Sequence, residues 1–232
     1  MSDTTVNDGE RPIPEYIAEI AQRLAAFEGS LPRELDPVAL SRSKLPFKAL
    51  GYRETLIWRI TELGKAALDN YNEHRFAAAI LLTRAAVETT AALWYLQSKI
   101  TSAIKADGLG DLDEYLMRLS LGSRNFEKSP VAINVLNFVD EVDNRFAGYR
   151  KQYDELSEYS HPNYLGTTCL YSVVDFDNYM VSFGANARGS KPAEIIGVMN
   201  LSVALMIFDH SYRRNADSAS GPNPNPPADS EV

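Results

Sequence analysis

A long apolar stretch, residues 74–100, most constrains the fold of this 232-residue chain. Its centre is apolar around the whole circumference of a helix, which is typical of a helix that other elements cover on all sides. Two charged residues interrupt it: Arg84 and Glu88 lie four positions apart and therefore share one helix face. We expect several further helices as cover, together with polar groups that satisfy these two charges, because an unpaired buried charge is costly.

Apolar residues recur at helical spacing in several other segments. The expected helices are residues 13–27, about 54–71, 111–121 and about 192–214. Between residues 135 and 156 the apolar positions alternate steps of four and three, which predicts one long helix packed lengthwise on a partner. Ser129 and Pro130 are expected as its N-cap and first residue. Its end is expected at His161, because Pro162 disfavours the helical conformation in the residue before it.

The chain changes character after this helix. Residues 167–174 and 179–183 flank the polar stretch 175–178, which predicts a β-hairpin with a four-residue turn. Cys169, the single cysteine, falls in the first of these strands and is expected to be a buried thiol; one cysteine excludes an intramolecular disulfide and a Cys-rich zinc site. The predicted fold class is therefore all-α: a helical bundle with a small C-terminal β-hairpin and a final helix. Residues 12–214 would form one domain, between a disordered N-terminus (1–11) and a disordered tail (215–232).

The overall charge limits the function classes. A net charge of −8 gives no reason to expect broad attraction to nucleic acid. A short basic series is interpreted as a solvated surface in preference to a binding patch; it comprises Arg42, Lys44, Lys48, Arg53 and Arg59. The apolar runs 76–96 and 193–208 contain polar or charged residues and are expected to be buried helices of a cytoplasmic protein without membrane contact. No motif for a metal or a cofactor is present, so neither is expected.

The candidate site lies near the end of the long helix. Tyr153, Ser157 and His161 follow one another at intervals of four, and we expect them to meet Arg84 and Glu88 in one polar network. His161 at a helix C-terminus favours its protonated form, and Glu88 or Glu158 would add to that effect. Such a histidine can act as a general acid or base, with Arg84 and Glu88 as further catalytic candidates. The alternative is a structural network that stabilises the bundle. Glu158 and Asn163 complete the candidate binding or network residues, with Tyr153 and Ser157.

These residues carry a resemblance to a known family. The matching features are Asn70-Tyr71-Asn72, the run Arg-Phe-Ala-Ala-Ala-Ile at 75–80, Arg84 with Glu88, and Tyr-x-x-Leu-Ser-Glu-x-Ser-His-Pro at 153–162. Over residues 54–165 the chain resembles the HEPN superfamily, and most of all its uncharacterised bacterial members. The resemblance implies a four- or five-helix bundle that is often dimeric. Many members are metal-independent endoribonucleases in toxin, defence or RNA-processing systems, and others are non-catalytic binding modules.

The resemblance is incomplete at one position that matters for function. Nuclease members carry an Arg shortly before the His of this motif, whereas the corresponding residues here are Asp154, Glu155 and Leu156. The favoured prediction is therefore a non-catalytic, HEPN-like interaction or dimerisation module of a bacterial defence or toxin–antitoxin type system, with a second copy or another protein as partner. The alternative is a metal-independent endoribonuclease or RNA-binding effector that uses His161.

Overall fold

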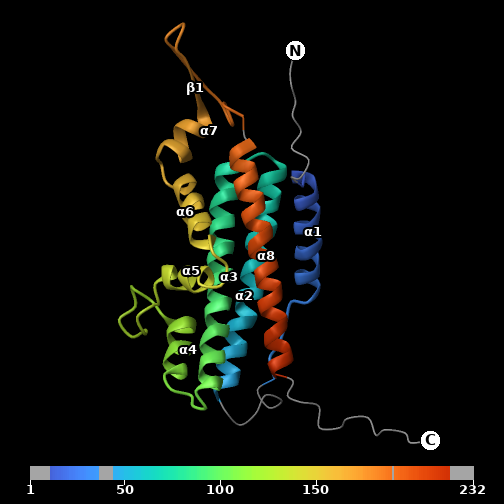
Figure 1. Cartoon of the computed structure of the whole chain (residues 1–232), viewed down its shortest axis with the longest axis vertical. Helices are drawn as coiled ribbons and strands as arrows, with labels where there is room; N and C mark the ends of the chain where they lie inside the picture. The colour runs from blue at the N-terminus through green and yellow to red at the C-terminus, as the bar shows by residue number, and fades with distance from the viewer. Residues whose placement is uncertain (1–10, 37–43, 190, 220–232) are drawn as a thin grey trace, which may run out of the picture.

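Helix α3 (Phe76–Lys105) forms the centre of a helical bundle (Figure 1). The computed structural model describes residues 11–36, 44–189 and 191–219. Around α3 lie α2 (Lys44–Asn72), α4 (Leu112–Leu121), α5 (Val135–Asp143), α6 (Tyr149–Ser160) and α8 (Lys191–Ala219), all in contact with it. Its buried residues face every direction, as expected of a covered helix. The predicted all-α fold class is confirmed.

The outer helix α1 (Ile13–Gly29) packs against α2 and α8. It buries Ile20, Leu24 and Phe27 at helical spacing, and the Phe27 ring lies 5.6 Å from that of Phe208.

The predicted helices at 13–27 and 111–121 are present, but α2 begins ten residues before the predicted start at 54. Pro46 lies in its first turn, where a missing N–H costs no hydrogen bond. The last helix, α8, continues to Ala219. Residues 215–219 are therefore helical, and the prediction of a disordered tail was wrong for them. Residues 1–10 and 220–232 lie outside the described part.

The predicted single long helix is wrong, because α5 and α6 are separate helices. Gly148 separates them with φ +97°, a left-handed conformation that costs glycine no steric strain. The Asp143 carboxylate accepts hydrogen bonds from the backbone N–H groups of Gly148 and Arg150 at 2.9 and 3.0 Å, which starts the second helix. Nor does a helix start at Ser129: Asn134 caps α5 by accepting from the Leu136 N–H at 3.1 Å. Both helices still bury most of the predicted apolar stripe, but Phe146 lies between them and is exposed.

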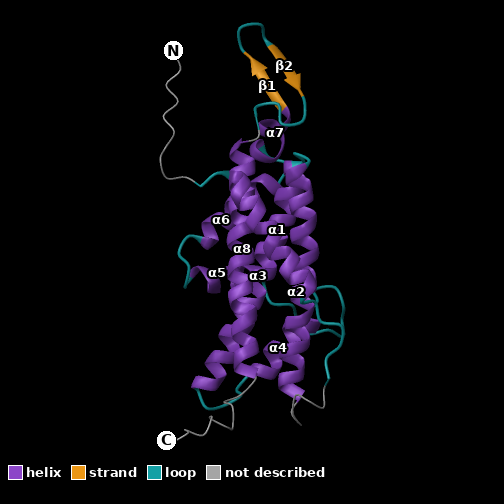
Figure 2. Cartoon of the chain, turned by 90° about the vertical axis from the view of Figure 1, so that its right-hand side faces the viewer, coloured by secondary structure: helices purple, strands orange, loops and turns teal. Residues whose placement is uncertain are grey.

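A two-stranded antiparallel hairpin, β1 (Ser172–Asp175) and β2 (Met180–Phe183), projects beyond one end of the bundle (Figure 2). Val174 pairs with Val181. The predicted first strand is too long, because the π-helical turn η1 (Tyr164–Thr168) and the short α7 (Cys169–Tyr171) precede it. Asn163 starts this turn by accepting from the Gly166 N–H at 3.1 Å. Cys169 is therefore helical and only partly buried, which corrects its predicted strand position.

Two helices in the described part are long and apolar enough to cross a membrane by length and composition, namely α3 and the segment Lys191–Arg213 of α8. In the structure 61% of the apolar window of α3 is buried, and 50% of that of α8. A buried core helix passes the same test of length and composition, so this observation carries no argument for a membrane span.

Candidate functional site

Four polar side chains of α3 and α6 join in one cluster, here called the Arg84 network: Arg84, Glu88, Tyr153 and Ser157. Arg84 donates from Nε to Ser157 Oγ at 3.0 Å and from Nη2 to Tyr153 Oη at 2.5 Å. The Tyr153 hydroxyl in turn donates to Glu88 Oε1 at 2.9 Å, and Ser157 donates to the Tyr153 backbone carbonyl at 2.9 Å. Arg84 and Glu88 also form an ion pair at 3.4 Å. The structure thus brings together four of the five residues that the sequence predicted to meet.

The register of α6 on α3 explains why these groups meet. Tyr149, one turn before Tyr153, is buried and donates its hydroxyl to the Val87 backbone carbonyl at 2.9 Å. Tyr153 follows four residues later, and the Arg84 guanidinium carbon lies 4.9 Å from its ring centre, within the range of a cation–π contact. Burial raises the pKa of Tyr153, and the hydrogen bond to Glu88 raises it further. The hydroxyl therefore stays a neutral donor between the two charged groups.

His161 does not join the Arg84 network. It is the C-cap of α6, with an extended backbone at φ −91° and ψ 151°, and its side chain is exposed. Among the described residues its side chain has no hydrogen-bond partner. Glu158, one of its two predicted carboxylate neighbours, instead accepts from Asn163 Nδ2 at 2.5 Å. The extended backbone that Pro162 imposes turns His161 out of the helical spacing on which the predicted contact depended.

The electrostatic surroundings of α6 disfavour a phosphate. A surface depression of about 510 Å³ beside this helix is lined mainly by carboxylates, with two cations among them; the lining residues are Asp143, Gly148, Arg150, Lys151, Asp154, Glu155 and Glu158. Arg150 is already paired with Asp140 at 2.6 Å and with Asp154 at 3.1 Å. The net negative charge of this surface repels a nucleic-acid backbone.

The basic series of the second helix does not form an open patch either. Lys48 pairs with Asp113 at 2.5 Å, Arg53 pairs with Glu54, and Arg59 donates to Thr89 Oγ1 at 3.1 Å. Arg42 lies outside the described residues. In the described part of the chain, no group of three His, Cys, Asp or Glu side chains is placed to hold a metal ion.

Sequence reasoning missed a polar pocket of about 310 Å³ between α3 and α5. Its lining mixes hydroxyl, amide and charged groups with one aromatic ring: Trp94, Gln97, Ser98, Thr101, Ser102, Lys105, Glu141, Asn144 and Arg145. Ser98 donates to Glu141, while Gln97 Oε1 is buried without a hydrogen-bond partner. The available signal was the spacing of polar residues along the second half of α3, which places them on one helix face.

Comparison of the chain with protein-family models, with curated proteins and with solved structures found no match. The resemblance to the HEPN superfamily therefore stays a prediction.

Proposed function

We propose that the chain is a non-catalytic, HEPN-like interaction module that forms a homodimer. The observation that supports this proposal is the set of contacts that Arg84 makes. Its guanidinium donates to Tyr153 and Ser157 and pairs with Glu88, so it already has the partners that a phosphate would otherwise supply. A catalytic pair of Arg84 and His161 would need both side chains to reach one substrate atom. One of them is instead held in the interface between α3 and α6, and the other is exposed beyond the end of α6.

Exposed apolar side chains support the interaction role. The hairpin carries several large apolar residues with well over half of their surface open, and a contiguous exposed apolar patch is typical of a protein–protein interface. The acidic surface beside α6 and the net charge of −8 favour a protein partner over a nucleic acid.

A combined assay tests the proposal. Purified wild-type protein, His161→Ala and Arg84→Ala are incubated with labelled cellular RNA in the presence of a chelator, and the oligomeric state is measured by sedimentation. We expect intact RNA in all three samples, no retention of RNA that weakens with salt, and a wild-type dimer. Metal-independent cleavage that His161→Ala abolishes would overturn the non-catalytic part and establish the endoribonuclease alternative. A wild-type protein that sediments as a monomer at every concentration would overturn the homodimer.

A further inference from the structure

The hairpin, residues 172–183, receives little direct support from the bundle. Its two strands pair with each other, and neither makes extensive contact with a helix of the bundle. The chain enters β1 from η1 and α7, and it leaves β2 through residues 184–188, here called the strap. A small hairpin joined to a domain through one chain connection alone is free to swing about that connection. The contacts of the strap therefore decide whether the hairpin points in one direction.

The strap turns back over the base of the hairpin, where the chain is anchored in the core. Leu170 of α7 and Ser172 of β1 are both buried, and the Leu170 side chain belongs to the hydrophobic core. The Ala187 N–H donates to the Leu170 carbonyl at 3.0 Å, and the Gly184 N–H donates to the Tyr171 carbonyl at 3.0 Å. The strap is thus hydrogen-bonded to backbone that the core already holds in place.

Arg188 connects the strap to the first residues of β1 and η1. Its Nε donates to the Ser172 carbonyl at 2.7 Å, and its Nη1 donates to the Tyr164 hydroxyl at 3.2 Å. The guanidinium carbon also lies 5.8 Å from the centre of the Tyr164 ring, within the range of a cation–π contact. A guanidinium presents its donors in fixed directions within one plane, so these contacts restrain an angle as well as a distance.

Asn186 attaches the strap to the bundle itself. Its Nδ2 donates at 2.8 Å to the backbone carbonyl of His74, which lies in the turn between α2 and α3. Both residues have left-handed backbones, with φ +55° for Asn186 and φ +56° for His74. Residues other than glycine keep this costly conformation only where the surrounding structure holds them in it. The hydrogen bond between Asn186 and His74 supplies such a restraint on both sides of the contact.

We infer that the strap holds the hairpin in one direction relative to the bundle, with Arg188 and Asn186 as its positioning residues. It ties the base of the hairpin to η1 on one side and to the turn between α2 and α3 on the other. Without these contacts the hairpin can swing about η1. A hairpin that already points in one direction loses less freedom when it binds a partner, which favours association. Only this consequence rests on the interaction role proposed above.

The test measures distances between the hairpin and the bundle by electron paramagnetic resonance. Cys169→Ser removes the single thiol of the chain, and Asp177→Cys and Glu62→Cys provide exposed sites for spin labels on the hairpin turn and on α2. We expect a single narrow distance distribution in this background. Arg188→Ala combined with Asn186→Ala should make the distribution about twice as wide, while the melting temperature stays unchanged, because only a local attachment is lost.

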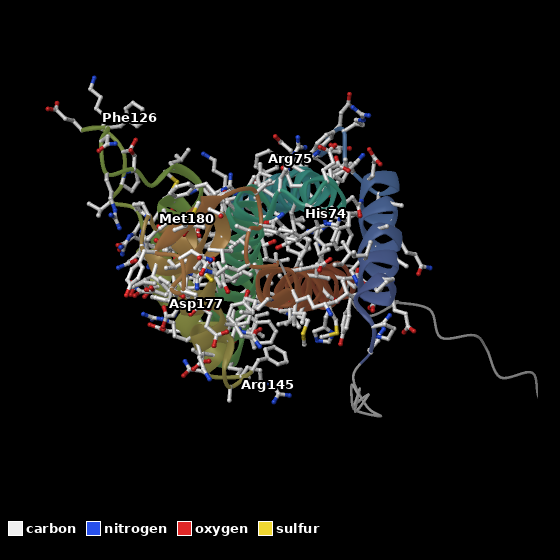
Figure 3. The ribbon with its side chains drawn as sticks, turned by 90° about the horizontal axis from the view of Figure 1, so that it is seen from above. His74, Arg75, Phe126, Arg145, Asp177 and Met180 are labelled. Atoms are coloured by element: carbon white, nitrogen blue, oxygen red, sulfur yellow. The ribbon has the colours of Figure 1, made fainter. Side chains whose placement is uncertain are left out.

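Two further variants separate positioning from a general loss of structure. Arg188→Lys keeps the charge and a donor but not the planar fork, so with Asn186 intact it should give a width between those of the background and the double variant. Arg124→Ala is the matched control, because Arg124 is exposed and shares a loop with Phe126, which lies away from Asp177 and Met180 of the hairpin in Figure 3.

The control should leave the distribution unchanged. A wide distribution in the background, or no widening in the double variant, would overturn the inference and leave the proposed interaction role in place. A widening that a lower melting temperature accompanies would also overturn it, since the bundle itself would then be loosened. Because the measurement needs no partner, failure of the interaction role in the sedimentation assay above is a separate result.

Discussion

Arg84 and Tyr153 meet twice across the interface between α3 and α6. The guanidinium carbon lies 4.9 Å from the centre of the tyrosine ring, and Nη2 donates to the hydroxyl at 2.5 Å. The same hydroxyl donates onward to Glu88, so a single phenol oxygen connects the cation and the carboxylate of α3. The pair fixes how far α6 can slide along α3. Both contacts join α3 to α6 and hold the two helices together.

The Tyr153 hydroxyl should contribute measurably to stability. Tyr153→Phe leaves Arg84 and Glu88 each without one partner, and we expect a loss of about 1–2 kcal/mol in the free energy of unfolding. Tyr164→Phe is the control, since Tyr164 is 57% exposed and its hydroxyl only accepts from Arg188 at 3.2 Å. His161→Ala should change stability by less than about 0.5 kcal/mol, as expected of an exposed residue. Urea unfolding measures the free energy of unfolding of all three variants. A loss for His161→Ala equal to that for Tyr153→Phe would mean that His161 takes part in the Arg84 network.

The break between α5 and α6 depends on the Asp143 carboxylate. Asp143→Ala removes the acceptor of two backbone N–H groups at the start of α6, and we expect a loss of about 1 kcal/mol. Asp143→Asn keeps an acceptor oxygen and should recover most of that stability. Thermal unfolding monitored by circular dichroism separates the two. Equal losses in both variants would mean that the negative charge, and not the hydrogen bonds, starts the helix.

Gly197 of α8 packs against Tyr71 of α2 without room for a side chain. A Cβ atom there would lie 2.0 Å from the Tyr71 hydroxyl oxygen, and Tyr71 is buried and bonded to Thr83 at 2.8 Å. Gly197→Ala should therefore destabilise by about 1–3 kcal/mol through overpacking. The matched control is Gly51→Ala in α2, where a Cβ meets nothing within 4 Å. That change should be neutral or stabilising by up to about 1 kcal/mol, because alanine favours a helix. Urea midpoints of the two variants give the comparison.

Buried Tyr149 and half-buried Tyr52 predict that the protein loses stability at alkaline pH. Burial raises the pKa of Tyr149 well above its ordinary value and that of Tyr52 to about 12. A raised pKa in the folded state means that the folded protein retains a proton that the unfolded chain loses. The stability that this contributes is complete below the unfolded pKa of about 10 and falls as the pH rises above it. The melting temperature should therefore decline from about pH 10 upwards.

Tyr149→Phe provides the control for the alkaline effect. It removes one titrating hydroxyl, so its melting temperature should fall less between pH 9 and pH 11 than that of the wild type. At pH 7 the variant should be less stable by about 1 kcal/mol, because the Val87 carbonyl loses its donor. If the melting temperatures of the variant and the wild type fell in parallel above pH 10, Tyr149 would not contribute to the pH dependence of stability.

The sequence predicted those features of the fold that depend on the regular spacing of residues along a helix. Helical spacing of apolar residues located α1, α3 and α4, and the interval of four between Arg84 and Glu88 placed them on one face. The contact of Tyr153 and Ser157 with this pair was predicted from the same rule, applied to the segment that forms α6. The periodicity of apolar residues does not reveal a break in a helix when both of the resulting helices pack on the same partner helix. The stripe from Val135 to Leu156 therefore continued through Gly148, and the capping role of Asp143 was not visible in it.

The errors near His161 and the hairpin have a common physical origin. Helical spacing stops at the residue before a proline, so the position of the His161 side chain depends on the local backbone and not on the pattern of α6. After it, Thr167, Thr168 and Cys169 have the composition of a strand, but the Asn163 side chain starts a helical turn there. That turn needs a residue without a side chain: a Cβ at Gly166 would lie 2.0 Å from the His161 carbonyl oxygen. Such local side-chain and backbone contacts override the strand propensity of the residues that follow.

The central position of α3 has a consequence for how the molecule opens. Because five other helices contact it, its backbone amides can exchange with solvent only when most of the bundle separates. The hairpin is attached only at its base, so it can open and close without disturbing the rest. Deuterium should therefore enter the hairpin within the shortest labelling times and enter α3 last. Labelling would thus separate the segment that opens locally from the helix that exchanges only when the whole bundle unfolds.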